Sequence, residues 1–565
     1  MIASEYDVQV NLMSKYVIGI DYGTLSGRAS LVDLSDGCVL ASAVYDYPHA
    51  VMDTAIPCGT PLPPDWALQH PQDYMDVLNH TIPAILQDSG VNPADVIGVG
   101  LDVTASTAMP CRKDGTPLCF LPEYESNPHA YVKLWKHHAA QEKASIMTEV
   151  AKARGEWWLP AYGGKVSSEW SLPKLWQVMD EAPEIYAAMD CWVEATDWIV
   201  WQLCGVWMQD SCCAGYKCMY DKEHGYPSEE YFAALDERLR HVVREKLWAP
   251  VVPIGTRVGG LTQEMAARFG LTPGIAIAAG GIDAHVAVMA AGITRPGQML
   301  AIIGTSTCHM LLDTKRQSVP GICGSVEDGI IPGFWGYESG QSCVGDHYAW
   351  MTQRFVPEDY RRAAREKGIS IHTYLTSLAE KLAPGESGLL ALDWWNGNRS
   401  ILVDVDLTGM LLGLTLQTQP EEIYRALVEG TAYGMRTVVE NYAEHGACID
   451  EVYALGGISQ KNAMVMQIYA DVLGVPVRVV DCEQGGALGS AIMGAVAAGA
   501  YPGFEQAIHA MGAPVLRVYE PIAAHAAIYD SLYGEYKLLH DYFGRGENDV
   551  MKRLKKIRAD ARKDN

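Results

Sequence analysis

"YVIGIDYGTLSGRASLVDL", residues 16–34, contains two apolar runs separated by a short polar turn. This pattern predicts two antiparallel strands joined by a tight hairpin. The first strand ends at Asp21, and the bend that follows brings together Gly23, Thr24, Ser26, Gly27 and Arg28. A hairpin needs only one or two turn residues with positive φ. The carboxylate, hydroxyls and guanidinium around this bend therefore form either a polar surface turn or part of a binding site.

A second hairpin of the same kind begins the other half of the chain. "QMLAIIGTSTCHMLLD", residues 298–313, again has two apolar runs, here around a turn with Gly304, Thr305 and Ser306. The likeness is one of pattern and not of residue identity, which indicates a weak internal repeat. Strand and helix patterns alternate after both hairpins, which favours an α/β fold. The boundary between the halves falls at "GITRPGQ", residues 292–298.

Bulk properties restrict the class of protein. The 565 residues are too many for one hydrophobic core, and 49% apolar with 20% charged residues is typical of a globular chain. A net charge of −25 argues against nucleic-acid binding, which needs a basic face. We expect neither a membrane span nor a secretory signal, because no long apolar run occurs. We expect no zinc site, because no Cys-x-x-Cys spacing occurs. Scattered cysteines are expected to be reduced in a cytoplasmic protein.

The two ends of the chain stand apart from this pattern. Residues 1–15 are predicted to be an N-terminal extension. Residues 546–565 contain "MKRLKKIRADARKDN", a basic tail with helical spacing. The tail is either a solvated surface helix or a site for an anionic partner.

Glycine-rich turns suit phosphate, because backbone N–H groups in such turns converge on phosphate oxygens without needing a lysine. Two turns from opposite halves could hold one polyphosphate from both sides of a cleft. Asp21, at the end of its strand, is the expected Mg²⁺ ligand, since magnesium on nucleotide phosphates needs only one or two carboxylates. Neither G-x-G-x-x-G leading into a helix nor G-x-x-x-x-G-K-[ST] occurs in these turns, which excludes the Rossmann and Walker A modes there.

Phosphoryl transfer to an alcohol also needs a group that takes the hydroxyl proton. Asp283 is the candidate, because it follows the Gly280-Gly281 break between a buried strand and a helix. The alternative is that Asp283 only caps that helix, for which Asp is well suited.

Four segments, in order, carry a resemblance to a known family: "GIDYGTLSGR" (19–28), "GGIDAH" (280–285), "IGTST" (303–307) and "ALGGISQKN" (454–462). Over about residues 16–500 the chain resembles the FGGY carbohydrate kinases of the actin-like ATPase superfamily. The resemblance implies two RNase H-like domains, residues 16–293 and 294–545, that flank a cleft. It also implies ATP and Mg²⁺ as cofactors, with sugar bound mainly by the first domain and nucleotide mainly by the second.

Further segments are similar to the branch of this family that phosphorylates L-ribulose, and they include "VTASTAMP" (103–110), "LWKHHAA" (134–140), "CCAGYK" (212–217), "GYESGQSCVGDHYAW" (336–350) and "LDWWNGNRS" (392–400). The resemblance implies that the sugar is held by Ala105, Trp135, Lys136, Lys217, Asp283 and Glu338. It implies nucleotide contacts at Gly23, Thr24, Ser26, Arg28, Gly304, Thr305, Ser306, Gly456, Gly457 and Asn462. Lys217 could instead be a solvated turn lysine, and Glu338 a turn carboxylate.

Two other functions stay open on the residues alone. One is a kinase for a different ketopentose or polyol, such as D-ribulose, xylulose or glycerol, because related sugars differ only in hydroxyl configuration. The other is an ATP-switched scaffold like actin, which has the same core but no sugar pocket. The expected partners are a small sugar and ATP, and a homo-oligomer is compatible with the sequence.

Overall fold

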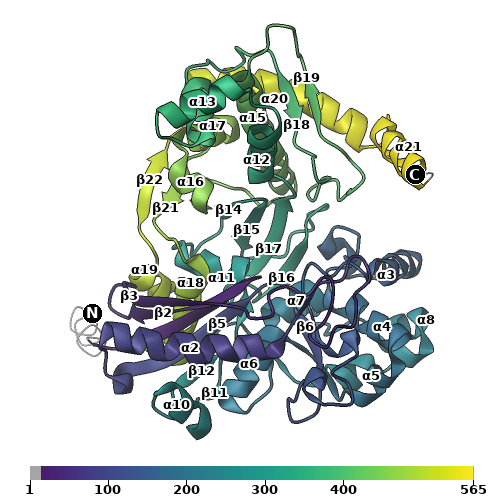
Figure 1. Ribbon diagram of the computed structural model, residues 1–565, viewed down its shortest axis with the longest axis vertical. Coiled ribbons are helices and arrows are strands. Elements are labelled where there is room, and N and C mark those ends of the chain that lie inside the picture. Colours follow the sequence, from purple (N-terminus) through teal and green to yellow (C-terminus); the bar gives the residue numbers. More distant parts are fainter. Residues whose placement is uncertain (1–13, 564–565) are drawn as a thin grey trace.

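The structure, a computed structural model, describes residues 14–563 in two large halves that lie one above the other in Figure 1. The predicted N-terminal extension falls almost entirely outside the described residues. Among residues 14–563, no helix combines the length and the apolar composition needed to cross a bilayer. All of the cysteines are free thiols.

The first half is built on a seven-stranded sheet with the order β11-β12-β5-β1-β2-β3, in which β13 also pairs with β5. The predicted hairpin forms β1 and β2, with β3 antiparallel to β2, while β5 runs parallel to β1 and β12 parallel to β5. The strands are β1 (Tyr16–Tyr22), β2 (Ser26–Asp33), β3 (Val39–Asp46), β5 (Val96–Val103), β11 (Arg257–Gly260), β12 (Ala276–Ala278) and β13 (Gly281–Ile282).

The second half repeats this arrangement in a sheet with the order β16-β17-β15-β14-β20-β21-β22. Here β14, β15 and β17 are successively antiparallel, and β20 and β21 add parallel strands beside β14. The strands are β14 (Gln298–Ile303), β15 (Thr307–Asp313), β16 (Gly324–Glu327), β17 (Trp335–Gln341), β20 (Glu451–Leu455), β21 (Val477–Val480) and β22 (Val515–Tyr519). Three antiparallel strands followed by two parallel ones in each half confirm the predicted pair of RNase H-like α/β domains.

Helices cover these sheets, and the first half also carries an inserted lobe with a small sheet, β4-β7-β6-β8, and a tryptophan-rich core. Besides the seven strands of the large sheet, the first half contains β4 (Leu68–Gln69), α2 (Pro71–Ser89), β6 (Ala108–Cys111), β7 (Val132–Lys133), α3 (Gln141–Arg154), α4 (Ser171–Glu181), α5 (Pro183–Ala188), β8 (Cys191–Glu194), α6 (Ala195–Cys204), α7 (Ser211–Cys218), α8 (Glu229–Leu235), α9 (Val242–Lys246) and α10 (Gln263–Phe269), of which α2, α6 and α10 pack on the large sheet. The corresponding elements of the second half are α12 (Gly345–Arg354), α13 (Glu358–Glu366), α14 (Ile371–Ala379), β18 (Leu390–Leu392), β19 (Met410–Leu412), α15 (Pro420–Glu444), α16 (Gly457–Lys461), α17 (Ala463–Leu473), α19 (Phe504–Met511), α20 (Ala523–Gly544) and α21 (Val550–Lys563).

Two helices, α11 (Asp283–Ala290) and α18 (Gly485–Ala497), lie between the two sheets (Figure 1). Although α18 comes late in the chain, it packs on β1 and β5 of the first sheet. Glycines permit this close approach, because a Cβ on Gly100 would lie 2.0 Å from the Ser490 carbonyl oxygen. Side chains from both halves, such as Val17, Leu300 and Ile492, share one core around these helices. Residues on both sides of the predicted boundary therefore share one core, and the bounds 16–293 and 294–545 stay a prediction.

Candidate active site between the two halves

Asp283 lies where two cavities meet. The first, of about 460 Å³, lies between the halves and is called here the inner cavity. The second, of about 650 Å³, is lined by Asp21, Gly456 and Gly457 among others and is called the nucleotide-side cavity. Asp283, Ala284 and Cys308 line both cavities. A carboxylate at this junction can contact molecules bound on either side.

Both hairpin turns face the inner cavity, where Thr24 of the first turn lines the wall with Thr305 and Ser306 of the second. Within the turns, the Gly23 amide donates to the Ser26 carbonyl at 2.9 Å, and the Gly304 amide donates to the Ser306 carbonyl at 2.9 Å. These two amides therefore close the turns, and phosphate binding would depend mainly on the other amides and hydroxyls of the bends.

Asp283 is the first residue of α11, after a strand that ends at Ile282. The N-cap is Ile282, and among residues 14–563 the Asp283 carboxylate accepts only the amide of its neighbour Ala284, at 2.7 Å. Capping therefore does not account for this side chain. Burial, and then the nearby charge of Asp21, raise the pKa of Asp283 to about 7. A half-buried carboxylate with such a pKa can accept a proton near neutral pH.

Three carboxylates gather at this junction. Asp21 on β1 stands beside Asp102 on β5 in the parallel register, and Asp102 is paired in turn with Gly281, two residues before Asp283. Asp102 is fully buried. Its Oδ2 accepts the Ser490 hydroxyl at 2.7 Å, while its Oδ1 has no hydrogen-bond partner within the described part of the chain. Burial and then Asp21 raise the pKa of Asp102. Two neighbouring carboxylates, Asp21 and Asp102, are the kind of oxygen ligands that suit Mg²⁺, whose charge would relieve the repulsion between them.

Asp102 is absent from the residues predicted from sequence. The available signal was that "IDY" (20–22) and "LDV" (101–103) both place an aspartate near the end of a buried strand. Only the parallel pairing of β1 with β5 brings the two side by side. Arg28, which was predicted as a phosphate contact, has its Nε 3.5 Å from Asp21 Oδ2.

Glu338 on β17 is the centre of an ion-pair network across the inner cavity. Its carboxylate accepts from Lys217 Nζ at 2.8 Å and from an Arg399 guanidinium nitrogen at 2.6 Å. His285 Nε2 lies 3.6 Å away. Burial alone would raise the pKa of Glu338, but Lys217 and then Arg399 outweigh it and hold the pKa at about 2. Lys217 and Glu338 are both buried, so neither is a solvated turn residue. Arg399 was not predicted individually, because it lies in a loop without periodicity.

The predicted residues divide into two groups by position. The two cavities are lined by Ala105, Trp135, Lys217, Asp283, Glu338, Thr24, Thr305, Ser306, Asp21, Gly456 and Gly457. Trp135 also donates to the Thr24 hydroxyl at 3.2 Å. The structure does not place Gly23, Ser26, Arg28, Gly304, Lys136 or Asn462 in the lining of either cavity. Lys136 is exposed, and Asn462 caps α17 by accepting the Val465 amide at 3.2 Å.

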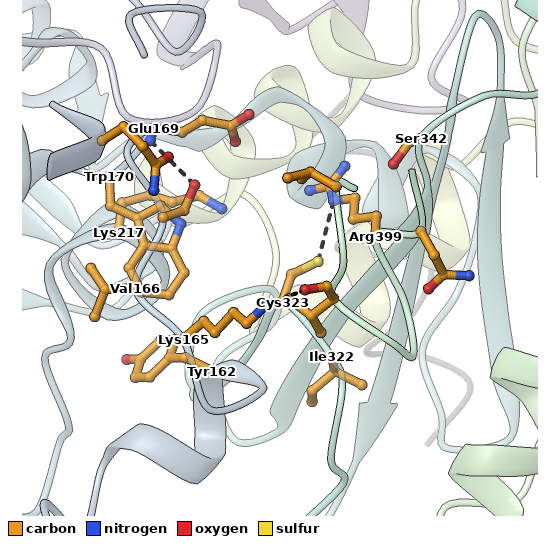
Figure 2. Close-up of a pocket in the computed structure, with 15 residues that line it drawn as sticks. Tyr162, Lys165, Val166, Glu169, Trp170, Lys217, Ile322, Cys323, Ser342 and Arg399 are labelled. Atoms are coloured by element: carbon orange, nitrogen blue, oxygen red, sulfur yellow. Dashed lines mark hydrogen bonds between the residues drawn. The ribbon is translucent and has the colours of Figure 1, made fainter. Parts of the chain in front are cut away.

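A third cavity, of about 340 Å³ and called here the outer cavity, adjoins the inner one and shares Glu169, Trp170, Lys217, Ser342 and Arg399 with it. Figure 2 shows Glu169, Trp170 and Lys217 on one side and Arg399 with Cys323 on the other. The inner cavity therefore has neighbours at both ends. The nucleotide-side cavity begins at Asp283, and the outer cavity begins at Lys217 and Arg399.

Comparison with known proteins gives full-length relatives. A protein named "Ribulokinase" from Geobacillus thermodenitrificans is 54% identical over 553 residues, which cover 97% of this chain and 98% of the relative. Another "Ribulokinase", from Mycolicibacterium smegmatis, is 47% identical over 550 residues and 97% of both chains. A solved xylulose kinase from Rhodospirillum rubrum has a TM-score of 0.76 at 23% identity, covering 93% of this chain and 98% of its own. This last likeness concerns the fold.

Family comparison covers most of the described chain. The N-terminal domain of the FGGY family of carbohydrate kinases matches residues 16–290, and its C-terminal domain matches residues 299–498. These ranges contain both hairpins, the three carboxylates and the Lys217–Glu338 pair described above. The chain therefore belongs to the FGGY family of carbohydrate kinases.

Proposed function

We propose that the protein transfers the γ-phosphoryl group of ATP to the terminal hydroxyl of L-ribulose, giving L-ribulose 5-phosphate and ADP. The observation that supports this best is the position of Asp283 at the junction of the inner and nucleotide-side cavities. The relatives named "Ribulokinase", at 54% identity over nearly the whole chain, favour L-ribulose as the sugar.

In this proposal the sugar occupies the inner cavity with its terminal hydroxyl at Asp283. The hydroxyl oxygen forms a bond to the γ-phosphorus, the bond from that phosphorus to the bridging oxygen breaks, and ADP retains the electron pair. The Asp283 carboxylate accepts the hydroxyl proton. Because the transition state is loose, positioning and charge outweigh base strength. Lys217 has donors beyond the one that Glu338 accepts, and these would orient sugar oxygens.

ATP would lie in the nucleotide-side cavity, with Gly456 and Gly457 near the adenosine, and its γ-phosphate would extend past Asp283 toward the hairpin turns, whose Thr24, Thr305 and Ser306 line the inner cavity. Asp21 and Asp102 would hold Mg²⁺, which supplies neutralising charge on the phosphates. The two halves share one core around α11 and α18, so closing motions about this core would exclude water. A cytoplasmic location, where the free thiols stay reduced, is part of the same proposal.

The test is ADP release measured with purified protein, ATP and Mg²⁺ across the four 2-ketopentoses and glycerol. We expect the highest kcat/KM with L-ribulose. Asp283→Asn should lower kcat by about 10² or more, the scale of general-base loss. Asp88→Asn, an exposed change on α2, is the matched control. Higher kcat/KM with glycerol or another ketose would assign a different kinase, and ATP turnover unaffected by any sugar would favour a scaffold.

A further inference from the structure

The basic C-terminal helix α21 lies against a loop, residues 398–408, that lines the outer cavity and reaches the inner cavity through Arg399. We propose that α21 is a positioning element for the 398–408 loop, and that Lys552 and Lys555 hold this loop so that Arg399 reaches Glu338. The inference rests on the proposed function, because it assigns the loop to the sugar site. It identifies the partner of the basic tail as an acidic segment of the same chain.

Two ion pairs join the helix to the loop. Lys552 Nζ lies 2.7 Å from Asp404 Oδ2, and Lys555 Nζ lies 2.8 Å from Asp406 Oδ1. Lys555 also donates to the Val405 carbonyl at 3.0 Å. Met551, on the same helix, is buried in the core of the second half, and its sulfur accepts the Thr408 amide at 3.5 Å. Burial of Met551 therefore anchors the helix in the core, and the two ion pairs fix its position relative to the loop.

Hydrogen bonds join two parts of this loop, so contacts that hold one part in place also hold the other. Asn398 and Asp404 exchange two backbone hydrogen bonds, each of 2.9 Å. The Asn398 side chain accepts the Leu402 amide at 2.9 Å. Val403 between them has φ of +51°, a conformation that persists only where surrounding contacts enforce it. Fixing Asp404 from α21 therefore fixes Asn398 and the residue after it, Arg399.

Arg399 connects the 398–408 loop to the proposed sugar site. Its guanidinium donates to Glu338 and to Cys323 Sγ, at 2.6 Å and 3.2 Å, and Figure 2 shows it opposite Lys217 and Glu169. Val403 and Val405 line the outer cavity with it. Lys165, from the first half, donates to the Val403 carbonyl. The 398–408 loop consequently contacts α21 on one side and both halves of the site on the other.

The experiment reverses the charge of the two lysines and compares steady-state kinetics of the full-length chain. Lys552→Glu with Lys555→Glu should raise KM for L-ribulose about 3- to 10-fold, the scale of two lost surface pairs. The KM for ATP should change less than twofold. Lys556→Glu, an exposed neighbour on the same helix, should leave both values unchanged. Met551 is unchanged in every variant, so the apolar contacts that anchor the helix are retained.

A charge exchange separates positioning from simple loss of stability. Lys552→Asp combined with Asp404→Lys should restore KM for L-ribulose to within about twofold of the wild type. Hydrogen exchange of residues 398–408 should become faster in the Lys552→Glu, Lys555→Glu variant and return toward wild type in the exchanged variant.

Three outcomes would overturn the proposal: unchanged sugar KM and exchange rates in the double variant, an equal effect of Lys556→Glu, or no rescue by the charge exchange. If the wild type does not phosphorylate L-ribulose, the proposed function fails. Hydrogen exchange of the loop then still decides whether α21 positions it.

Discussion

Lys217 on α7 and Glu338 on β17 meet at 2.8 Å across the two halves of the protein, although they are 121 positions apart in the chain. Their side chains are only 6% and 4% exposed. Removing one member of a buried pair costs about 3–5 kcal/mol, because the other charge is left uncompensated. The pair therefore joins the two halves at the wall of the inner cavity and presents polar groups to it. A second pair between the halves, Lys222 with Asp328 at 2.7 Å, has its lysine half exposed.

Lys217→Met should raise KM for the sugar tenfold or more, because a donor in the inner cavity is lost and Glu338 retains only Arg399 and His285. The measurement is the dependence of ADP release on sugar concentration. Lys222→Met removes a half-exposed lysine that pairs with Glu327 and Asp328, and it should change the sugar KM less than twofold, because Lys222 lines none of the three cavities. Equal effects of the two changes would contradict a role for Lys217 at the site.

Activity should depend on the protonation of Asp283. Because burial and Asp21 raise its pKa to about 7, kcat/KM should increase with pH and level off above that value. The profile is obtained from initial rates between pH 5.5 and about 9 at saturating ATP. A profile that is flat through pH 7 would exclude Asp283 as the proton acceptor.

Ionisation of the Asp283 carboxylate should lower the free energy of unfolding at high pH. The folded state keeps a proton on Asp283 up to about pH 7, whereas the unfolded chain loses it near pH 4, so stability falls as pH rises through this interval. Asp283→Asn should therefore raise the free energy of unfolding by on the order of 1–4 kcal/mol at pH 8 and by less at pH 5. An equal change at both pH values would show that the gain does not come from this ionisation.

Lys174 is expected to position one wall of the inner cavity. Its ammonium is buried and donates to the carbonyls of Ser106 and Leu134, at 2.6 Å and 2.9 Å. Ser106 lines the cavity with φ of +50°. Lys174→Met should raise the sugar KM about tenfold with little change in kcat, because it removes a buried, charged hydrogen-bond donor. Lys152→Met, an exposed change on α3, is the control. A fall in kcat without a change in KM in Lys174→Met would contradict the positioning role of Lys174.

Packing of α18 on the first sheet should tolerate no side chain at Gly100. A Cβ there would lie 2.0 Å from the Ser490 carbonyl oxygen, so Gly100→Ala should lower the thermal midpoint by several degrees or prevent folding. Gly534→Ala, on α20 with nothing within 4 Å of its Cβ, should be neutral or slightly stabilising. The comparison uses thermal unfolding of both variants, and equal midpoints would contradict tight packing at this contact.

Local patterns in the sequence were sufficient for the two hairpins, for the repeated α/β topology and for Asp283 at a strand–helix junction. Each depends on residues close together in the chain: alternating apolar runs, glycines at bends and an acidic residue at a helix start. The membership of Lys217 and Glu338 in one site came from resemblance, and the structure adds their direct contact.

The tertiary structure alone decided the contacts between distant segments. Asp102 reaches Asp21 through parallel strand pairing, α18 packs on the sheet of the other half, and Arg399 reaches Glu338 from an aperiodic loop. The basic tail shows the same limit, because its charge pattern fits a solvated helix as well as one paired with Asp404 and Asp406. Sequence periodicity records which face of an element is buried, but not which remote element covers it, and that choice depends on the packing of the whole chain.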